Sequence, residues 1–365
     1  MVELSGLWNS IQSWLFPALE DELGDQLSEK QQEFVKVCEL LDLEKHMTSY
    51  KWNYEGRPPK DRLAIVKSFI AKSVYNLPTT KALVEYVKSS PSLRRLCGWE
   101  SVGEIPSEST FSRAFSAFAE GELGQNIHKS TIEEHYQDKV VGHLIRDSSA
   151  IKGREKAIKK PQKESVKAPK RKRGRPKKGE ERPKPEQTKV QIQVHRSLEE
   201  NVTDLPIDCD WGTKRNSKGK KETWCGYKLH LDAGDGDVPI TCLLTSASVY
   251  DNQAAIPLAQ ISSERVTNLY DLMDAAYDTK EIKEFARGLG HVPLIDDNPR
   301  RGKKLEKAPA ERIRYNERST AERVFSNLEN YGSKTVRVQG PKKVMCHLMF
   351  GVISLTANQL FNMVI

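Results

Sequence analysis

Three acidic residues in the second half of the sequence have the local context of metal ligands. Asp147 ends the apolar run "VVGHLIRD", Asp274 ends "VTNLYDLMD", and Glu322 lies in the helix-like segment "RYNERSTAERVF". Carboxylate oxygens suit Mg²⁺ or Mn²⁺, and two such ions can activate water or a 3′-hydroxyl and stabilise the leaving oxygen of a phosphodiester. Isolated carboxylates at strand ends more often cap turns, so this interpretation depends on the order of the surrounding elements.

The residues around Glu322 add a second signal. Tyr315, Arg318 and Glu322 are spaced by three and then four positions, which predicts one stripe of a helix. Arg318 lies one turn before Glu322, so its guanidinium can reach the phosphate that the metal ions engage. Tyr315 lies one turn further back and can donate to a phosphate oxygen. The alternative is a solvated helix face with an ion pair.

The elements that must position these residues follow in a definite order. A strand ends near Asp147, a basic insertion follows, and "CGYKLHLDAGDGDVPITCLLTSA" predicts a hairpin. Then come a helix, a strand ending at Asp274, a helix, a strand and two helices. This order predicts a mixed α/β fold with a five-stranded sheet flanked by helices. If the first and fourth strands are neighbours, Asp147 and Asp274 meet at one edge, and a helix across that edge brings in Glu322.

The N-terminal part, residues 1–137, reads as all helical. Ser28 and Gln31 form a capping-box pattern before an apolar helical period. In "PSESTFSRAFSAFAEG" the residues Phe111, Phe115 and Phe118 recur with helical spacing. A short helix, a turn and a helix that opens with polar residues are compatible with a helix-turn-helix DNA reader. An ordinary helical bundle is the alternative.

The positive charge is concentrated between the first strand and the hairpin. The chain has a net charge of +8, residues 152–189 carry +12, and the rest therefore carries −4. This Pro- and Lys-rich insertion, residues 151–189, is expected to be disordered when free. Its string "KRKRGRPKKG" resembles the AT-hook, which binds the minor groove of A·T-rich DNA, and the core of that motif is Arg173, Gly174, Arg175 and Pro176. A solvated charged linker is the alternative.

A second basic stretch lies between Trp211 and Trp224. It either follows a DNA backbone or forms a solvated turn, and its cations are Lys214, Arg215, Lys218, Lys220 and Lys221. Either Trp can stack on an unpaired base, or it can pack in the core or at a sheet edge.

Several other classes of protein are disfavoured. The six cysteines are scattered without a CxxC, which argues against zinc sites and a disulfide framework and fits a reducing compartment. The N-terminus lacks the features of a secretory signal. The apolar C-terminal stretch has its large residues at helical spacing, which favours a buried core helix over a membrane span; these residues are Val344, Leu348, Val352 and Leu355. We therefore expect no membrane partner.

From about residue 140 onward, the sequence resembles the catalytic domain of the DDE transposases of bacterial insertion sequences. The resemblance lies in "HLIRDSSAI", "DWGTKRNSKGKKETWCGYKLHLDAGDGDVPITCLLTSASVYDNQ", "LMDAAYDTKEI", "RYNERSTAERVFSNLE" and "RVQGPKKVMCHLMFGVISLTANQL". It implies a ribonuclease-H-like fold, with Asp147, Asp274 and Glu322 as the catalytic and metal-binding residues and two Mg²⁺ or Mn²⁺ ions as cofactors.

One large group of this family has the signature Tyr-x2-Arg-x3-Glu-x6-Lys. Tyr315, Arg318 and Glu322 match it, whereas Glu329 stands where the signature has Lys. A second anion there would repel a phosphate, although Lys334 or Arg337 can substitute. Only 48 positions separate Asp274 from Glu322, which leaves no room for the large β-insertion that some relatives carry between these residues.

The resemblance implies a DNA transposase. Residues 1–137 would bind the DNA ends, residues 138–150 and 190–365 would form the catalytic domain, and a homodimer would act on terminal inverted repeats and on target DNA. The expected location is the bacterial cytoplasm, in association with the nucleoid. Two rival hypotheses are a non-catalytic DNA-binding protein, descended from a decayed or domesticated transposase, and a nuclease with the same three acidic residues and no strand transfer.

Overall fold

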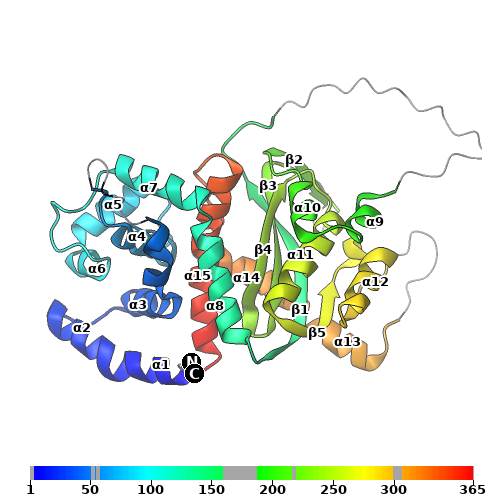
Figure 1. The fold of residues 1–365 in the computed structure, drawn as a ribbon, viewed down its shortest axis with the longest axis horizontal. Helices are drawn as coiled ribbons and strands as arrows, with labels where there is room; N and C mark the ends of the chain where they lie inside the picture. The colour runs from blue at the N-terminus through cyan, green and yellow to red at the C-terminus, as the bar shows by residue number, and fades with distance from the viewer. Residues whose placement is uncertain are drawn as a thin grey trace, which may run out of the picture.

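The structure is a computed structural model, which describes residues 4–50, 54, 58–158, 187–215, 219–298 and 306–364. A group of helices and a sheet-containing part lie on opposite sides of the long helix α15 (Pro341–Asn362) (Figure 1). The AT-hook-like residues 173–176 and Lys218 lie outside the described residues.

The N-terminal part is helical, as predicted from its periodicity. The capping box of Ser28 and Gln31 is confirmed at the start of α3, and the aromatic rings of Phe111, Phe115 and Phe118 are buried on one face of α7. The helices are α1 (Leu4–Ser10), α2 (Phe16–Leu23), α3 (Glu29–Leu41), α4 (Arg62–Val74), α5 (Thr80–Ser89), α6 (Pro91–Leu96), α7 (Glu108–Glu120) and α8 (Leu123–Tyr136), with a π-helical turn (Ile11–Leu15) and a 3₁₀ segment (Leu43–Tyr50).

The sheet of the second part is mixed, as predicted, and has six described strands instead of five. Its strands are β1 (Val140–Lys152), β2 (Asp210–Arg215), β3 (Lys221–Gly234), β4 (Val238–Ser246), β5 (Thr267–Met273) and β6 (Val292–Ile295). The order is β2-β3-β1-β5-β6, and β4 also pairs with β3. The additional strand is β2, in the basic stretch for which the sequence predicts either a contact with a DNA backbone or a solvated turn. Its residues pair antiparallel with the first half of the long strand β3.

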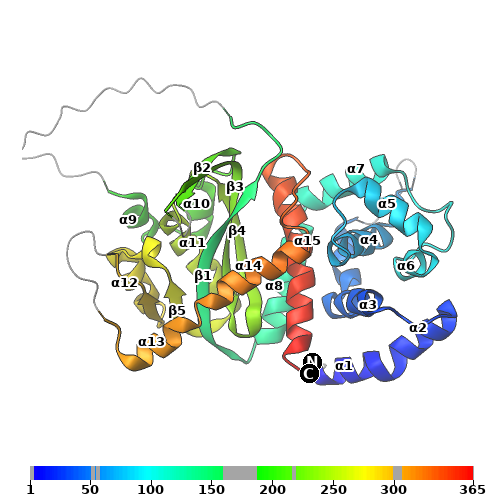
Figure 2. The same cartoon turned by 180° about the vertical axis from the view of Figure 1, so that it is seen from behind.

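Helices cover both faces of the sheet. On one face α11 (Asn252–Arg265) contacts β3 and β4 and lies beside α9 (Lys189–Gln193), α10 (Leu198–Thr203) and α12 (Lys280–Gly288). On the other face α14 (Ser319–Asn330) follows α13 (Pro309–Asn316) and crosses β1 and β3 (Figure 2). The short helices α9 and α10 were not anticipated from the sequence.

The C-terminal helix α15 connects the two parts. It contacts α3, α4, α7 and α8 on one side and β4 on the other, and its buried residues share one apolar cluster with Leu229 and Leu231 of β3. Among the described helices it is the one long and apolar enough to cross a membrane, but 89% of its apolar window is buried inside the protein. The prediction of a core helix is thus confirmed.

A buried ion pair fixes β1 in the sheet. Arg146 donates from Nε and Nη2 to the two carboxylate oxygens of Asp232 on β3, at 2.8 and 2.7 Å. Ser262 of α11 donates to the same carboxylate at 2.7 Å. Both charged side chains are almost completely buried, so Arg146 points to the α11 face. Because neighbouring side chains of a strand point to opposite faces, Asp147 points to the α14 face.

Loss of one partner of this pair should be costly. Asp232→Asn keeps the shape but leaves the Arg146 guanidinium buried and unneutralised, so we expect the free energy of unfolding to fall by about 3–5 kcal/mol. The measurement is urea unfolding followed by circular dichroism. Ser262→Ala, which removes the hydrogen bonds of the Ser262 hydroxyl to Asp232 and Thr241, is the control and should cost about 1–2 kcal/mol. Equal small losses in both variants would show that the pair does not hold the sheet.

Candidate active site

Asp147 and Asp274 lie side by side where the pairing of β1 with β5 ends. Asp274 directly follows β5, whereas β1, which the sequence predicts to end near Asp147, continues to Lys152 because it stays paired with β3. β1 and β5 are parallel, and Arg146 is the register partner of Met273, so the next residues along the two strands are the two aspartates. Asp147 accepts a hydrogen bond from the amide of Ser148 at 2.7 Å. Asp274 accepts from the amide of Ala276 at 2.8 Å and caps a 3₁₀ turn. The neighbouring strands that the sequence predicted are therefore present.

Negative charge is crowded around the carboxyl groups of Asp147 and Asp274. Burial raises the pKa of Asp147 to about 6, and the charges of Asp274 and Asp251 act in the same direction. Burial also raises the pKa of Asp274, again with Asp251 contributing. Both carboxylates are thus held in surroundings that disfavour two adjacent anions.

Arg318 connects this pair to Glu322. Its Nη1 atom lies 3.8 Å from a carboxylate oxygen of Asp147, and its Nη2 atom lies 3.2 Å from a carboxylate oxygen of Glu322. The side chain of Glu322 is 65% exposed. Asp147 and Glu322 therefore face the same guanidinium, and the cation lies between them.

The helix around the signature differs from the prediction. The sequence predicted a single helix carrying Tyr315, Arg318 and Glu322 on one stripe. Instead α13 ends at Asn316 and α14 begins at Ser319, with Arg318 in the N-cap position. The amide of Arg318 still bonds to the carbonyl of Tyr315 at 3.0 Å. Glu317 and Arg318, which link the two helices, keep right-handed helical backbone angles, so the spacing is kept although the residues belong to two helices.

Tyr315 is half-buried beside the acidic pair. The ammonium of Lys307 lies 4.3 Å from the centre of its ring, and burial raises the pKa of its hydroxyl to about 12, with Asp296 contributing in the same direction. Tyr315 thus remains a protonated donor near Asp147 and Asp274. The expectation that it donates to a phosphate stays a prediction.

Glu329, which stands where the signature has Lys, forms an ion pair with a nearby lysine. Lys334 donates to the Glu329 carboxylate at 2.9 Å, which neutralises the extra anion. Glu329 lies seven residues after Glu322, about 10 Å along α14. Arg337, the other proposed substitute for the signature Lys, instead lines a separate cavity between α7 and α15.

Asp251 is an acidic neighbour that the sequence did not single out. An aspartate before a helix suggests a cap, but its side chain makes no capping hydrogen bond to α11. It accepts from the hydroxyl of Ser148 at 2.7 Å and from the ammonium of Lys228 at 3.0 Å. Burial opposes its ionisation, but Lys228, His230 and Ser148 together outweigh this effect and lower the pKa of Asp251. Asp251 therefore carries a fixed negative charge beside Asp147.

Tyr277 is a second residue that sequence reasoning missed. It is almost completely buried, and its hydroxyl has no hydrogen-bond partner in the described parts of the chain. Burial and the charges of Asp251 and Asp147 raise the pKa of this hydroxyl well above its usual value. A polar atom of this kind, orphaned beside two carboxylates, is uncommon in a packed core.

Two of the three predicted metal ligands are assembled, and their carboxylate oxygens are of the kind that a hard divalent cation prefers. The pair Asp147–Asp274 offers oxygen atoms in an environment that disfavours their negative charge, and the guanidinium of Arg318 already occupies a position between Asp147 and Glu322. Within the described ranges, no three carboxylate, imidazole or thiolate groups converge closely enough to hold a metal ion. Asp147 and Asp274 are brought together, whereas Glu322 is joined to them through Arg318.

The two tryptophans of the basic hairpin have different environments. Trp224 is 6% exposed, and its indole donates to the carbonyl of Tyr227 at 3.1 Å, so it is a core residue. Trp211 on β2 is 59% exposed. Lys214 pairs in register with Glu222 and Arg215 with Lys221. This stretch is thus an antiparallel hairpin, and base stacking stays a prediction for Trp211 alone.

The sheet is mixed, helices cover both of its faces, and two acidic residues lie where a parallel strand pair ends. These features, with the family match below, define a ribonuclease-H-like α/β domain. A family model described as "Transposase DDE domain" matches residues 142–357, more than half of the chain. A second family model, described as "Transposase domain (DUF772)", matches residues 21–117. The chain therefore belongs to the DDE transposase family. No match was found among curated proteins or among solved structures.

The raised pKa of Asp147 predicts a pH-dependent stability in the presence of EDTA. A carboxyl whose pKa is about 6 when folded and about 4 when unfolded stabilises the fold while protonated, and this contribution is lost as the pH rises from about 4 to 6. Asp147→Asn, which is neutral throughout, should therefore exceed the wild type in unfolding free energy by roughly 1–3 kcal/mol at pH 7.5 and match it near pH 4.

The measurement is denaturant unfolding at a series of pH values. Asp138→Asn removes the same charge from an exposed position and controls for the change in net charge. A difference between Asp147→Asn and the wild type that stayed constant from pH 4 to 7.5 would contradict the assignment of a strained carboxylate at this site.

Proposed function

We propose that the protein is a DNA transposase that acts as a homodimer on the terminal inverted repeats of its own element. It hydrolyses a phosphodiester at each end, releases a 3′-hydroxyl, and joins that hydroxyl to target DNA. The observation that carries this proposal is the register of β1 and β5, which aligns Asp147 with Asp274 inside a domain matched by a DDE transposase model.

In this proposal Asp147, Asp274 and Glu322 would hold two Mg²⁺ or Mn²⁺ ions. When bound, such ions supply activation of the attacking oxygen and stabilisation of the leaving oxygen in an in-line displacement. The exposed side chain of Glu322 would turn from Arg318 toward the other two carboxylates. This movement is a rotation of one long side chain, and it needs no rearrangement of the sheet.

The residues of the chain itself would bind and orient the DNA. Once released from Glu322, the guanidinium of Arg318 would bind two oxygens of the scissile phosphate, since its planar fork matches that geometry. Tyr315, a protonated hydroxyl at neutral pH, would donate to a phosphate oxygen. Asp251, paired with Lys228, would keep Ser148, the residue after Asp147 on β1, in place.

Other regions would contribute DNA contacts outside the active site. The helical residues 1–137 would bind the DNA ends, and α7, whose first turn carries Ser109 and Thr110, is the candidate reading helix of a helix-turn-helix. The AT-hook-like motif would bind a minor groove. The enzyme would work in the bacterial cytoplasm at the nucleoid. These roles, like the domain boundaries given above, are proposals.

Alanine substitutions at the three acidic residues test the catalytic assignment. Asp147→Ala, Asp274→Ala and Glu322→Ala should each lower Mg²⁺-dependent cleavage of a duplex carrying the inverted repeat that flanks the gene by at least about 10³-fold, because the metal ligands are lost. Binding of the same duplex, measured by fluorescence anisotropy in Ca²⁺, should change by less than about threefold.

The matched control is Glu317→Ala, which removes an exposed carboxylate from the same segment as Glu322. It should cleave like the wild type. Normal cleavage by any one of the three variants would refute the role of that residue. Cleavage without joined products would favour the nuclease hypothesis, and binding without cleavage by the wild type would favour the non-catalytic DNA-binding protein.

A further inference from the structure

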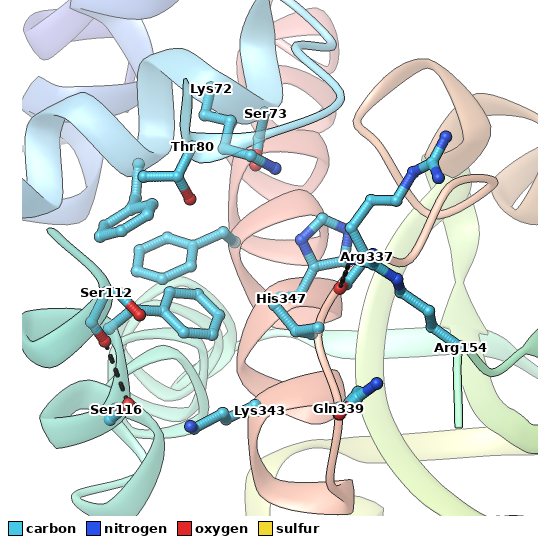
Figure 3. A pocket seen from close by; sticks show the side chains of 14 residues that line it. Lys72, Ser73, Thr80, Ser112, Ser116, Arg154, Arg337, Gln339, Lys343 and His347 are labelled. Atoms are coloured by element: carbon cyan, nitrogen blue, oxygen red, sulfur yellow. Dashed lines mark hydrogen bonds between the residues drawn. The ribbon is translucent and has the colours of Figure 1, made fainter. Parts of the chain in front are cut away.

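A cavity of about 430 Å³ lies where the N-terminal helices meet the sheet-containing part. Its walls are formed by α4, α7, the start of α15 and the segment that follows β1 (Figure 3). The floor is aromatic: the ring of Phe69 lies 5.1 Å from that of Phe115 and 5.5 Å from that of Phe350. The cavity is therefore both apolar at its base and accessible from solvent at its rim.

The polar lining of this cavity is cationic. Four basic side chains reach it from four separate segments, and no Asp or Glu is among the lining residues. Lys72 comes from α4, Arg154 from the chain after β1, Arg337 from the connection between α14 and α15, and Lys343 from the first turn of α15. Ser112 and Ser116 of α7 lie on the opposite wall from the two arginines (Figure 3).

These cations are not neutralised by their neighbours. In the described part of the chain, none of the four forms an ion pair within 4.0 Å. Arg154 donates from Nη1 to the carbonyl of Arg337 at 3.3 Å, which fixes the two arginines together. The nearby carboxylate of Glu155 instead accepts from the hydroxyl of Tyr227 and from the amide of Gly340.

Of the four cations, Lys72 alone is partly withdrawn from solvent, whereas Arg154, Arg337 and Lys343 are exposed. Burial lowers the pKa of the Lys72 ammonium to about 8. His347, which lies in the same cavity, stays neutral because burial and the charge of Lys72 lower its pKa to about 3. An unpaired ammonium in such a place destabilises the fold. A ligand that brings negative charge would offset this cost.

We propose that this cavity binds a backbone phosphate of the DNA whose end is cut at Asp147 and Asp274. This inference rests on the function proposed above. Seven residues of extended chain lead from Asp147 to Arg154, a span of at most about 25 Å. B-DNA rises 3.4 Å per base pair along each strand, so the bound phosphate lies within about seven nucleotides of the cut. One duplex can then contact the active site and this cavity together.

The test uses a fluorescein-labelled duplex carrying the inverted repeat that flanks the gene, in Ca²⁺, with full-length protein. The double variant Arg337→Ala/Lys343→Ala should bind it about tenfold more weakly and should lower the slope of log K against log salt by about 1. Lys280→Ala, which removes an exposed lysine of α12 that is paired with Glu284 and lies outside the cavity, is the matched control and should bind like the wild type.

Two further readouts separate a binding role from a structural one. A neutral methylphosphonate, placed singly at each position along the repeat, should weaken wild-type binding at one position within about seven nucleotides of the cut, and the double variant should lose that sensitivity. Lys72→Met should raise the melting temperature of the free protein while weakening DNA binding, because an unpaired charge is replaced by an apolar side chain.

Each outcome decides the question. Unchanged binding by the double variant, or no sensitive position near the cut, would overturn the phosphate site and leave the proposed function intact. Calorimetry with inorganic phosphate or a deoxynucleotide gives a further outcome. If the variants no longer bound these small anions but bound DNA normally, the cavity would be a site for a free anion, and the proposal would also be wrong. A wild-type protein that bound no repeat DNA would overturn the proposed function as well.

Discussion

The pairing of β1 with β5 is the constraint on which the candidate active site depends. The parallel register places Arg146 beside Met273, and therefore Asp147 beside Asp274. Side chains along a strand alternate between the two faces, so a shift of one residue would turn Asp147 toward α11. The buried pair of Arg146 and Asp232 opposes that shift, because the shift would separate a buried guanidinium from the carboxylate to which it donates two hydrogen bonds.

This arrangement forces like charges together. Asp147 and Asp274 are held close in partly buried positions, with Asp251 nearby, and the pKa of each of the first two is raised. The fold thus maintains an unfavourable concentration of negative charge next to the guanidinium of Arg318. The break between α13 and α14 places Arg318 at the start of a helix that crosses β1. Such unfavourable electrostatic surroundings are typical of sites that bind a cationic or phosphate ligand.

Periodicity and order predicted much of this architecture from the sequence. The helical N-terminal part, the β3–β4 hairpin and the core helix α15 follow from local patterns of apolar residues, which act over a few positions. The sequence did not predict features that depend on contacts with residues far away in the chain. Asp251 resembles a helix cap until Ser148 and Lys228 are placed beside it, and β2 lacks an apolar pattern because it pairs only with the exposed end of β3. The spacing of Arg318 and Glu322 predicted their contact but not the helix break before Arg318.

The central claim is that Asp147, Asp274 and Glu322 together hold divalent metal ions beside a DNA strand. Anomalous diffraction from crystals of the full chain with Mn²⁺ and a pre-cleaved duplex carrying the flanking inverted repeat tests it most directly. We expect two manganese peaks about 3.5–4 Å apart, with Asp147 bound to both ions and Glu322 turned away from Arg318 to complete the coordination. Manganese bound elsewhere, or an ion held at Asp147 and Asp274 while Glu322 stayed paired with Arg318, would refute the three-carboxylate site.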